Sequence, residues 1–143
     1  MASIREQVRT ALFGKLNVSG VTTNATGGIY NQIAPETAST PFVVFSLQVP
    51  GEVQRALGGG LQLQDDLWMV KAITSEADSS SYSPQELADL ILTAAETAIG
   101  TTLTLSSNTV RWCARFADIP PLVENVNDRL VWQHGFLLRV ASS

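Results

Sequence analysis

The chain contains one cysteine and one histidine, Cys113 and His134, residue types that could act together as nucleophile and general base. Each lies in a segment whose apolar residues alternate with a period of two, which is typical of a β-strand. If the apolar residues of both strands face one core, His134 points inward beside Trp132 and Cys113 points the other way. We therefore interpret the pair as a packed histidine and a small buried or half-buried thiol rather than as a catalytic dyad.

Two further motifs could bind an ion or a phosphate. Asp65 and Asp66 are adjacent carboxylates, but consecutive residues of a strand point to opposite faces, so they cannot share one ion without a bulge. The alternation loses its phase at this point, and we interpret the two aspartates as a solvated bulge or edge. Gly58-Gly59-Gly60 is not followed by the Lys-Ser/Thr of a phosphate-binding loop, which favours a hairpin tip. The sequence predicts no catalytic residue, no metal and no cofactor.

Composition limits the class of protein. The 143 residues, 45% of them hydrophobic and 15% charged, predict one globular domain over residues 1–143. The formal net charge of −4 gives no support to a general nucleic-acid-binding surface. No window approaches the roughly 20 apolar residues that a membrane helix needs, so we expect no membrane contact.

Two helices are predicted from capping signals. Ser3-Ile4-Arg5-Glu6 fits a capping box, and Ser83-Pro84-Gln85-Glu86 combines a serine cap with proline at the first helical position. Both helices should be amphipathic, and Gly100 should end the second. The expected buried residues are Ile4, Val8, Leu12 and Leu16 in the first helix and Leu87, Leu90, Ile91, Ala94, Ala98 and Ile99 in the second.

Strands are expected between and after these helices. The segments are "GIYNQIA" (28–34), Phe42 to Val49, Leu61 to Thr74, and two final strands around 110–116 and 130–140. In the first of the final strands, Val110, Trp112, Ala114 and Phe116 form the apolar set. Residues 118–128, "DIPPLVENVND", should form a long hairpin loop stiffened by Pro120-Pro121. The predicted fold class is α+β, a mostly antiparallel sheet with two main amphipathic helices.

Several apolar residues lie at positions where a side chain that faces water would normally be polar. The strand at Val43 to Phe45 is apolar on both faces, and two helices would not cover both, so another subunit could cover the second face. We expect contacts with a partner in the glycine-rich hairpin and in the 118–128 loop. The candidate residues are Val53, Arg55, Leu57 and Gly59 in the hairpin and Ile119, Leu122, Val123 and Val126 in the loop.

The two helices carry opposite charge. Arg5 and Arg9 lie in the first helix. Glu86 and Asp89 lie in the second, and no Lys or Arg occurs in the sequence between Lys71 and Arg111. Both could simply be solvated faces. A contact between the first helix of one copy and the second helix of the next would instead give the head-to-tail interface that closes rings.

The order of elements, together with "IYNQIAPETASTPFVVFSLQVPG", "LWMVKAIT", "SPQELADLILTAAETAI" and "VRWCARFADIPPLVENVNDRLVWQHGFLLRV", resembles the tail terminator family of long-tailed bacteriophages, also called tail completion or tail-to-head joining proteins. The likeness covers nearly the whole chain. It depends mostly on the "AP…TPFVVF" segment, on element order and on length, because the family has no catalytic signature.

The resemblance implies a non-enzymatic structural virion protein and a protomer of a ring, usually a hexamer. Such a ring caps the tail tube, ends tube polymerisation and joins the tail to the head connector in the neck, with DNA passing through the lumen. Its partners would be itself, the tail tube protein and the connector, and its place would be the virion, after synthesis in the host cytoplasm. The alternatives are another neck component, such as a head completion or connector-adaptor protein, and a small-molecule-binding domain or an enzyme that uses His134.

Overall fold

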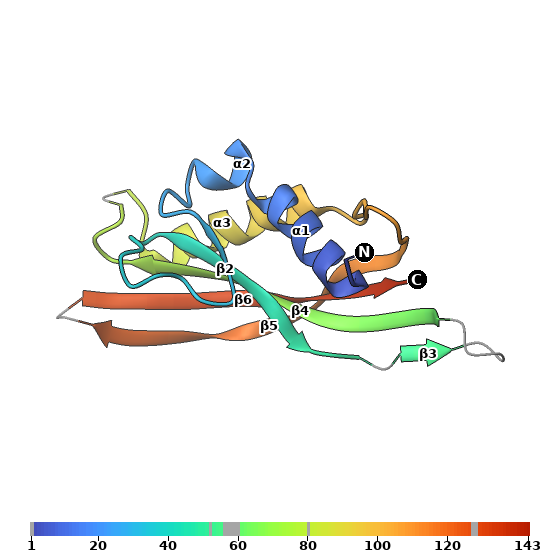
Figure 1. The fold of residues 1–143 in the computed structure, drawn as a ribbon. Helices are drawn as coiled ribbons and strands as arrows, with labels where there is room; N and C mark the ends of the chain where they lie inside the picture. The colour runs from blue at the N-terminus through green and yellow to red at the C-terminus, as the bar shows by residue number, and fades with distance from the viewer. Residues whose placement is uncertain (1, 52, 56–60, 80, 127–128) are drawn as a thin grey trace.

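The structure is a computed structural model that describes residues 2–51, 53–55, 61–79, 81–126 and 129–143. One sheet forms a layer, and the helices lie together on one of its faces (Figure 1). The elements in chain order are α1 (Ile4–Leu16), α2 (Ser19–Thr22), β1 (Ile29–Asn31), β2 (Phe42–Val49), β3 (Val53–Arg55), β4 (Leu61–Ser75), α3 (Pro84–Ile99), β5 (Val110–Val126) and β6 (Arg129–Ser142). The fold is α+β, as predicted.

The sheet is mostly antiparallel. Its strand order is β1-β2-β4-β6-β5, and β3 pairs with β4 on the side that β2 also occupies. The one parallel pair is β1 with β2. Helix α3 lies in the connection from β4 to β5, so the chain crosses the helix layer between a central strand and an edge strand.

The two main helices begin where the capping signals predict. The backbone N–H of Glu6 donates to Ser3 Oγ at 3.2 Å, and the Ser3 N–H donates to the Glu6 carboxylate at 3.1 Å. In α3 the Glu86 N–H donates to Ser83 Oγ at 3.2 Å, and Pro84 occupies the first turn. Gly100 follows with φ 65°, a conformation that glycine adopts without strain.

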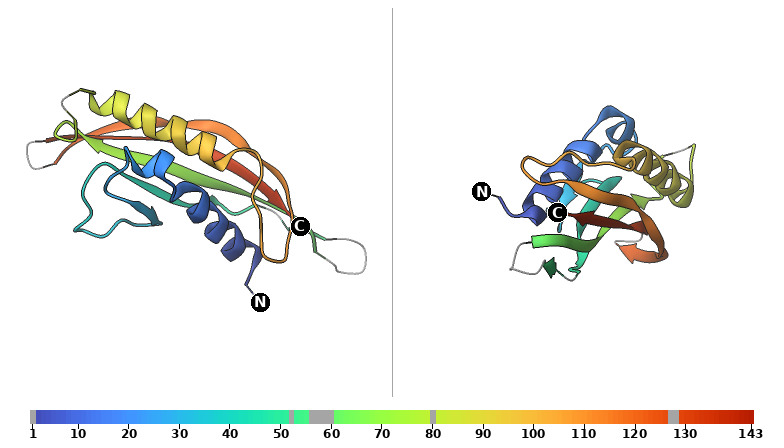
Figure 2. Two further views of the ribbon diagram at one scale, coloured as in Figure 1. Left: turned by 90° about the horizontal axis from the view of Figure 1, so that it is seen from above. Right: turned by 90° about the vertical axis from the view of Figure 1, so that its right-hand side faces the viewer.

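The core lies between the helices and the sheet face that they cover. The predicted α1 residues are all buried, and α1 and α3 lie side by side across that face (Figure 2). In α3 the buried face differs in part from the predicted one. Ala88, Leu92 and Ala95 are buried although they were not predicted to be, and Leu90, which was, is 39% exposed. Strand β2 is buried on both faces, as its sequence indicates, because Val43 and Phe45 join the core and Val44 on the opposite face is also buried.

The prediction of a loop over residues 118–128 is wrong. Strand β5 continues to Val126 and pairs with β6 as far as Arg129. Pro120-Pro121 falls at a register shift between Ile119 and Leu122 in a strand at the edge of the sheet. Proline is tolerated at such a place because it removes no hydrogen bond from a regular ladder.

The predicted orientation of β5 is also wrong. Cys113 lies opposite Val140 and is buried among the core residues, whereas Trp112 and Phe116 are 58% and 57% exposed. Register shifts between Val110 and Trp112 and between Arg115 and Ala117 break the strict alternation that the prediction assumed.

The predicted bulge does not lie at Asp65-Asp66 themselves. The pairing of β4 with β6 is continuous from Gln64 to Ser75, and the nearby register shifts lie in β2 between Leu47 and Val49 and in β4 between Leu61 and Leu63, where it pairs with β3. From Gln64 to Thr74 the even-numbered residues of β4 face the helices, so Asp66 is buried and Asp65 points the other way.

Asp66 joins three segments of the chain. Its carboxylate accepts from Arg5 Nε at 3.2 Å and Nη2 at 3.1 Å, from the Gly51 N–H at 2.8 Å and from Gln64 Nε2 at 3.0 Å. This contact raises the pKa of Arg5. At Gly51 a Cβ atom would lie 1.1 Å from the carbonyl oxygen of Asp65, so only glycine allows this close approach. The start of α1, the β2–β3 connection and β4 are therefore held together.

At its other end β4 is tied to α3. Thr74 is fully buried, and its hydroxyl donates to the carbonyl oxygen of Pro84 at 2.7 Å. The helix thus begins directly over the strand that precedes it.

Removing the Asp66 carboxylate is expected to lower the free energy of unfolding by about 2 to 3 kcal/mol, because Asp66→Ala leaves buried donors unpaired. Asp65→Ala is the matched control. Asp65 pairs with Arg139 on an accessible surface, and its loss should cost no more than about 1 kcal/mol. Urea denaturation measures both variants, and equal losses would contradict the assigned role of Asp66.

Candidate functional site

Cys113 and His134, the residues with the clearest chemical potential, lie far apart. Both face the helices, but Cys113 is opposite Val140 whereas His134 is opposite the Pro120-Pro121 irregularity. At about 3.3 Å per residue this separates them by about 20 Å along the sheet. His134 Nδ1 lies 3.3 Å from Oδ1 of Asp89, without the alignment of a hydrogen bond. The structure therefore does not bring the two together as a dyad.

Metal-binding residue types do not cluster in the described part of the chain. It contains no group of three or more His, Cys, Asp or Glu residues able to hold a metal ion. Across the same residues, no helix has both the length and the apolar character that a membrane crossing requires.

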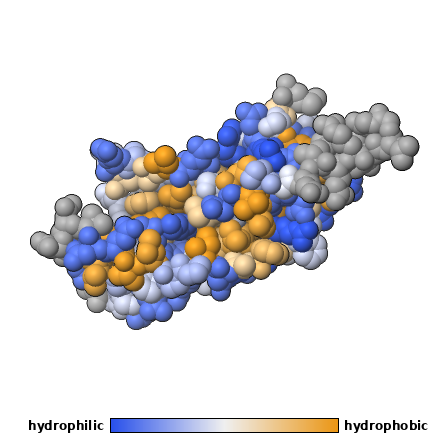
Figure 3. Space-filling view, turned by 90° about the horizontal axis from the view of Figure 1, so that it is seen from below, coloured by the Kyte–Doolittle hydropathy of each residue, from blue (hydrophilic) through white to orange (hydrophobic). Residues whose placement is uncertain are grey.

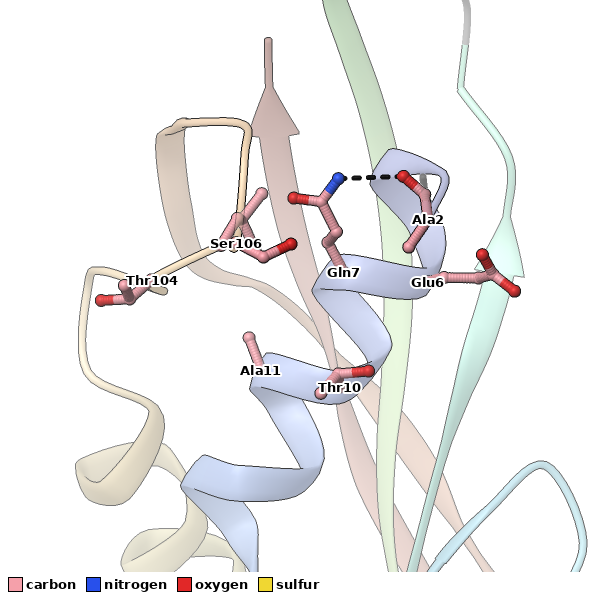
Figure 4. A pocket seen from close by; sticks show the side chains of 8 residues that line it. Ala2, Glu6, Gln7, Thr10, Ala11, Thr104 and Ser106 are labelled. Carbon is pink, nitrogen blue, oxygen red and sulfur yellow. Dashed lines mark hydrogen bonds between the residues drawn. The ribbon is translucent and has the colours of Figure 1, made fainter.

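A pocket of about 330 Å³ lies between α1 and the segment after α3 (Figure 4). One of the residues that line it, Gln7, forms hydrogen bonds within the chain. Gln7 donates to the carbonyl oxygen of Ala2 at 3.1 Å and to Asn108 Oδ1 at 2.8 Å. Its own oxygen accepts from the N–H groups of Ser107 and Asn108. The polar side-chain atoms of Gln7, the buried residue of this pocket, are therefore already paired within the chain.

The outer face of α3 carries two of the predicted interface residues. Glu86 and Asp89 line a groove of about 570 Å³ together with the exposed side chains of Tyr82 and Leu90. Among the described residues neither carboxylate has a Lys or Arg partner. The third acid of α3, Glu96, pairs at 2.7 Å with Arg115, whose pKa is raised chiefly by its hydrogen bond with Asp118. The groove therefore combines exposed apolar side chains with two carboxylates that have no Lys or Arg partner among the described residues.

The bases of α1 have partners within the same chain. Arg5 holds Asp66, and Arg9 lies 3.7 Å from Glu6 on the same helix. A contact between α1 of one copy and α3 of the next stays a prediction, and Arg5 could join it only by giving up its bonds to Asp66.

The predicted contacts of residues 119–126 lie on a strand rather than on a loop. Leu122 and Val123 are both about half exposed and sit opposite Gln133 and Trp132, so they face opposite sides of the sheet. Ile119 is half-buried. Val126 ends β5, and its side chain is outside the described part. The prediction that these residues contact a partner remains untested.

The glycine-rich hairpin is present as β3 paired with β4. Val53 lies opposite Gln64 and Arg55 opposite Leu61, which extends the ladder of β4 beyond the end of β2. The side chains of Val53 and Arg55 are outside the described part, as are Leu57 and Gly59 altogether.

The sequence indicated an apolar second face only at Val43 to Phe45, and it missed the rest of the sheet face opposite the helices, which we call the open face. Figure 3 shows apolar side chains gathered on it in patches between polar ones. Their positions alternate with those of core residues, which places them away from the helices. They are Val49, Leu67, Met69, Trp112, Leu122 and Leu137. Alternation in β4 and β6 could have revealed part of this face, but the irregular register of β5 hid Trp112.

Comparison with known proteins gives a likeness in structure alone. No family model and no curated protein matches the chain. A chain from the virion of a native gene transfer agent particle superimposes with a TM-score of 0.60 at 16% identity, covering 99% of each chain. A second solved chain, whose description gives no function, superimposes with a TM-score of 0.63 at 12% identity, covering 97% of this chain and 96% of the other. The whole fold is therefore shared with a virion chain.

Cys113 is expected to resist alkylation. Burial raises the pKa of its thiol to about 11, so at pH 8 the thiolate should be about 100-fold scarcer than for a thiol with the reference value of 9.0. Iodoacetamide labelling at pH 8, followed by mass spectrometry, should be at least about 100-fold slower in the folded chain than in urea. Equal rates would show that the thiol is accessible.

Proposed function

We propose that the chain is a structural virion protein of the tail-terminator type. The observation that carries the proposal is the likeness over 99% of both chains to a chain of a gene transfer agent virion. In this function, copies form a hexameric ring that caps the tail tube, ends its polymerisation and joins the tail to the head connector. The chain would act in the virion, without catalysis, and DNA would pass through the lumen.

Two properties of the surface support this proposal. Trp112 and Phe116 are more than half exposed, and aromatic side chains in such positions are typical of protein interfaces. Net charge is −4, which favours passage of DNA through a pore over adhesion to its wall.

The ring is expected to form from the purified protein alone. Light scattering after size-exclusion chromatography should give a mass of six chains, and electron microscopy should show rings that bind one end of purified tail tubes. Addition of the protein to polymerising tube subunits should shorten the tubes. A twelve-membered ring that binds the connector and leaves tube length unchanged would instead favour another neck component, and a monomer at high concentration would contradict the proposal.

His134 tests the alternative that the chain is an enzyme. We expect His134→Gln to leave assembly and tube capping unchanged, because an uncharged amide side chain of similar size can occupy the same position beside Asp89. The assembly assay described above measures this variant beside the wild-type chain. Turnover of a metabolite by the wild-type chain, lost in His134→Gln while assembly persists, would overturn the non-enzymatic reading.

A further inference from the structure

The open face ends at an edge strand that carries a large exposed aromatic residue. Trp112 lies on β5, and within the described residues no strand pairs with the outer side of β5. Leu67, Met69 and Leu137 extend the apolar surface across the neighbouring strands, each only partly covered. An exposed tryptophan beside apolar patches is a typical anchor of a protein contact.

The open face carries charged side chains of both signs without an ion-pair partner among the described residues. Lys71 lies near its centre and points to this face, since Val70 and Ala72 on either side of it belong to the core. Glu124 lies towards the far end of β5, opposite Val131, and Arg139 is paired with Asp65. A surface that fits the centre of the open face, around Lys71, should therefore be apolar and acidic.

The groove on α3 has that character. Tyr82 and Leu90 are its exposed apolar side chains, and Glu86 and Asp89 have no basic partner among the described residues. Helix α3 contains no Lys or Arg at all. The unpaired carboxylates of the groove are thus opposite in sign to Lys71 at the centre of the open face.

We infer that the open face of one copy, anchored by Trp112, binds the α3 groove of a second copy around Tyr82 and Leu90. This inference rests on the proposed self-assembly and names the two surfaces that produce it. The surfaces lie on opposite sides of a two-layer molecule (Figure 2), so each contact leaves one surface of either kind free. Such a contact can repeat from copy to copy and close into a ring.

The inference is tested with two variants that each lose one surface. Trp112→Asp removes the anchor of the open face, and Leu90→Asp removes the centre of the α3 groove. Alone, each should be a folded monomer, needing at least about tenfold more protein than the wild type for half-assembly. Mixed in equal amounts, they should form a dimer of one copy of each and nothing larger, because the pair retains one intact open face and one intact groove.

Controls keep the result specific. Circular dichroism and thermal melting check that both variants fold, and Trp112→Gln repeats the test with a milder change. Ile33→Asp alters a side chain that is 81% exposed outside both surfaces and should leave assembly unchanged. If the wild type is a ring and either variant still assembles normally, or the mixture stays monomeric, the inference fails while the ring stands. A monomeric wild type overturns both.

Charge reversal separates this contact from one between α1 and α3. Asp89→Lys is expected to weaken assembly in either case, so it does not decide between them. Lys71→Glu should raise the protein concentration for half-assembly about tenfold, and Arg9→Glu should leave it unchanged. Analytical ultracentrifugation at low salt measures both. The opposite pattern, a loss with Arg9→Glu alone, would overturn the inference in favour of contact between helices.

Discussion

The helices of this chain cover only one face of its sheet, and most of its other features depend on that arrangement. A layer of apolar strands needs cover on both sides, and α1 and α3 provide it on one. On the open face, Val44 is buried while Leu67, Met69 and Trp112 remain partly or largely accessible. A single copy of the chain therefore exposes to water an apolar surface of the kind that proteins normally bury in an interface.

Two groups of charged residues differ in their partners. One group holds the subunit together: Asp66 binds Arg5, and Arg115 joins α3 to β5 through Glu96 while its guanidinium lies 5.1 Å from the centre of the Phe136 ring. The other group, Lys71, Glu86 and Asp89, has no partner of opposite full charge among the described residues. Electrostatic complementarity of this kind mainly sets the register and choice of partner, while the apolar anchors supply most of the affinity.

The sequence allowed the helices, the fold class and most strands to be predicted, because caps and apolar periodicity are local signals. Ser3, Ser83 and Gly100 define helix ends in the structure as they do in the sequence. Strand β5 could not be predicted correctly, since its register shifts depend on its pairing with β6 and leave no local signal. Asp66 was misread for a related reason: a buried carboxylate looks like a break in alternation until its partner Arg5, from a distant segment, is known.

The candidate surfaces were found only in part from sequence. Glu86 and Asp89 were identified by charge alone, and the structure places them beside Tyr82 and Leu90 in one groove. Leu90 was assigned to the core because the apolar residues of α3 exceed one stripe, and only packing against the sheet decides which of them remain outside. Trp112 was likewise assigned inward, although it is among the most exposed aromatic side chains described.

Strand β4 connects the contacts that hold the two ends of the molecule together. Its 15 residues run from the pairing with β3, which has a register shift between Leu61 and Leu63, through the Asp66 junction, to Thr74 beneath the first turn of α3. A pull on the Leu61 end would act in shear on many ladder hydrogen bonds at once instead of opening them one by one. A load applied at this end of the longest central strand would thus enter the molecule without peeling the sheet apart.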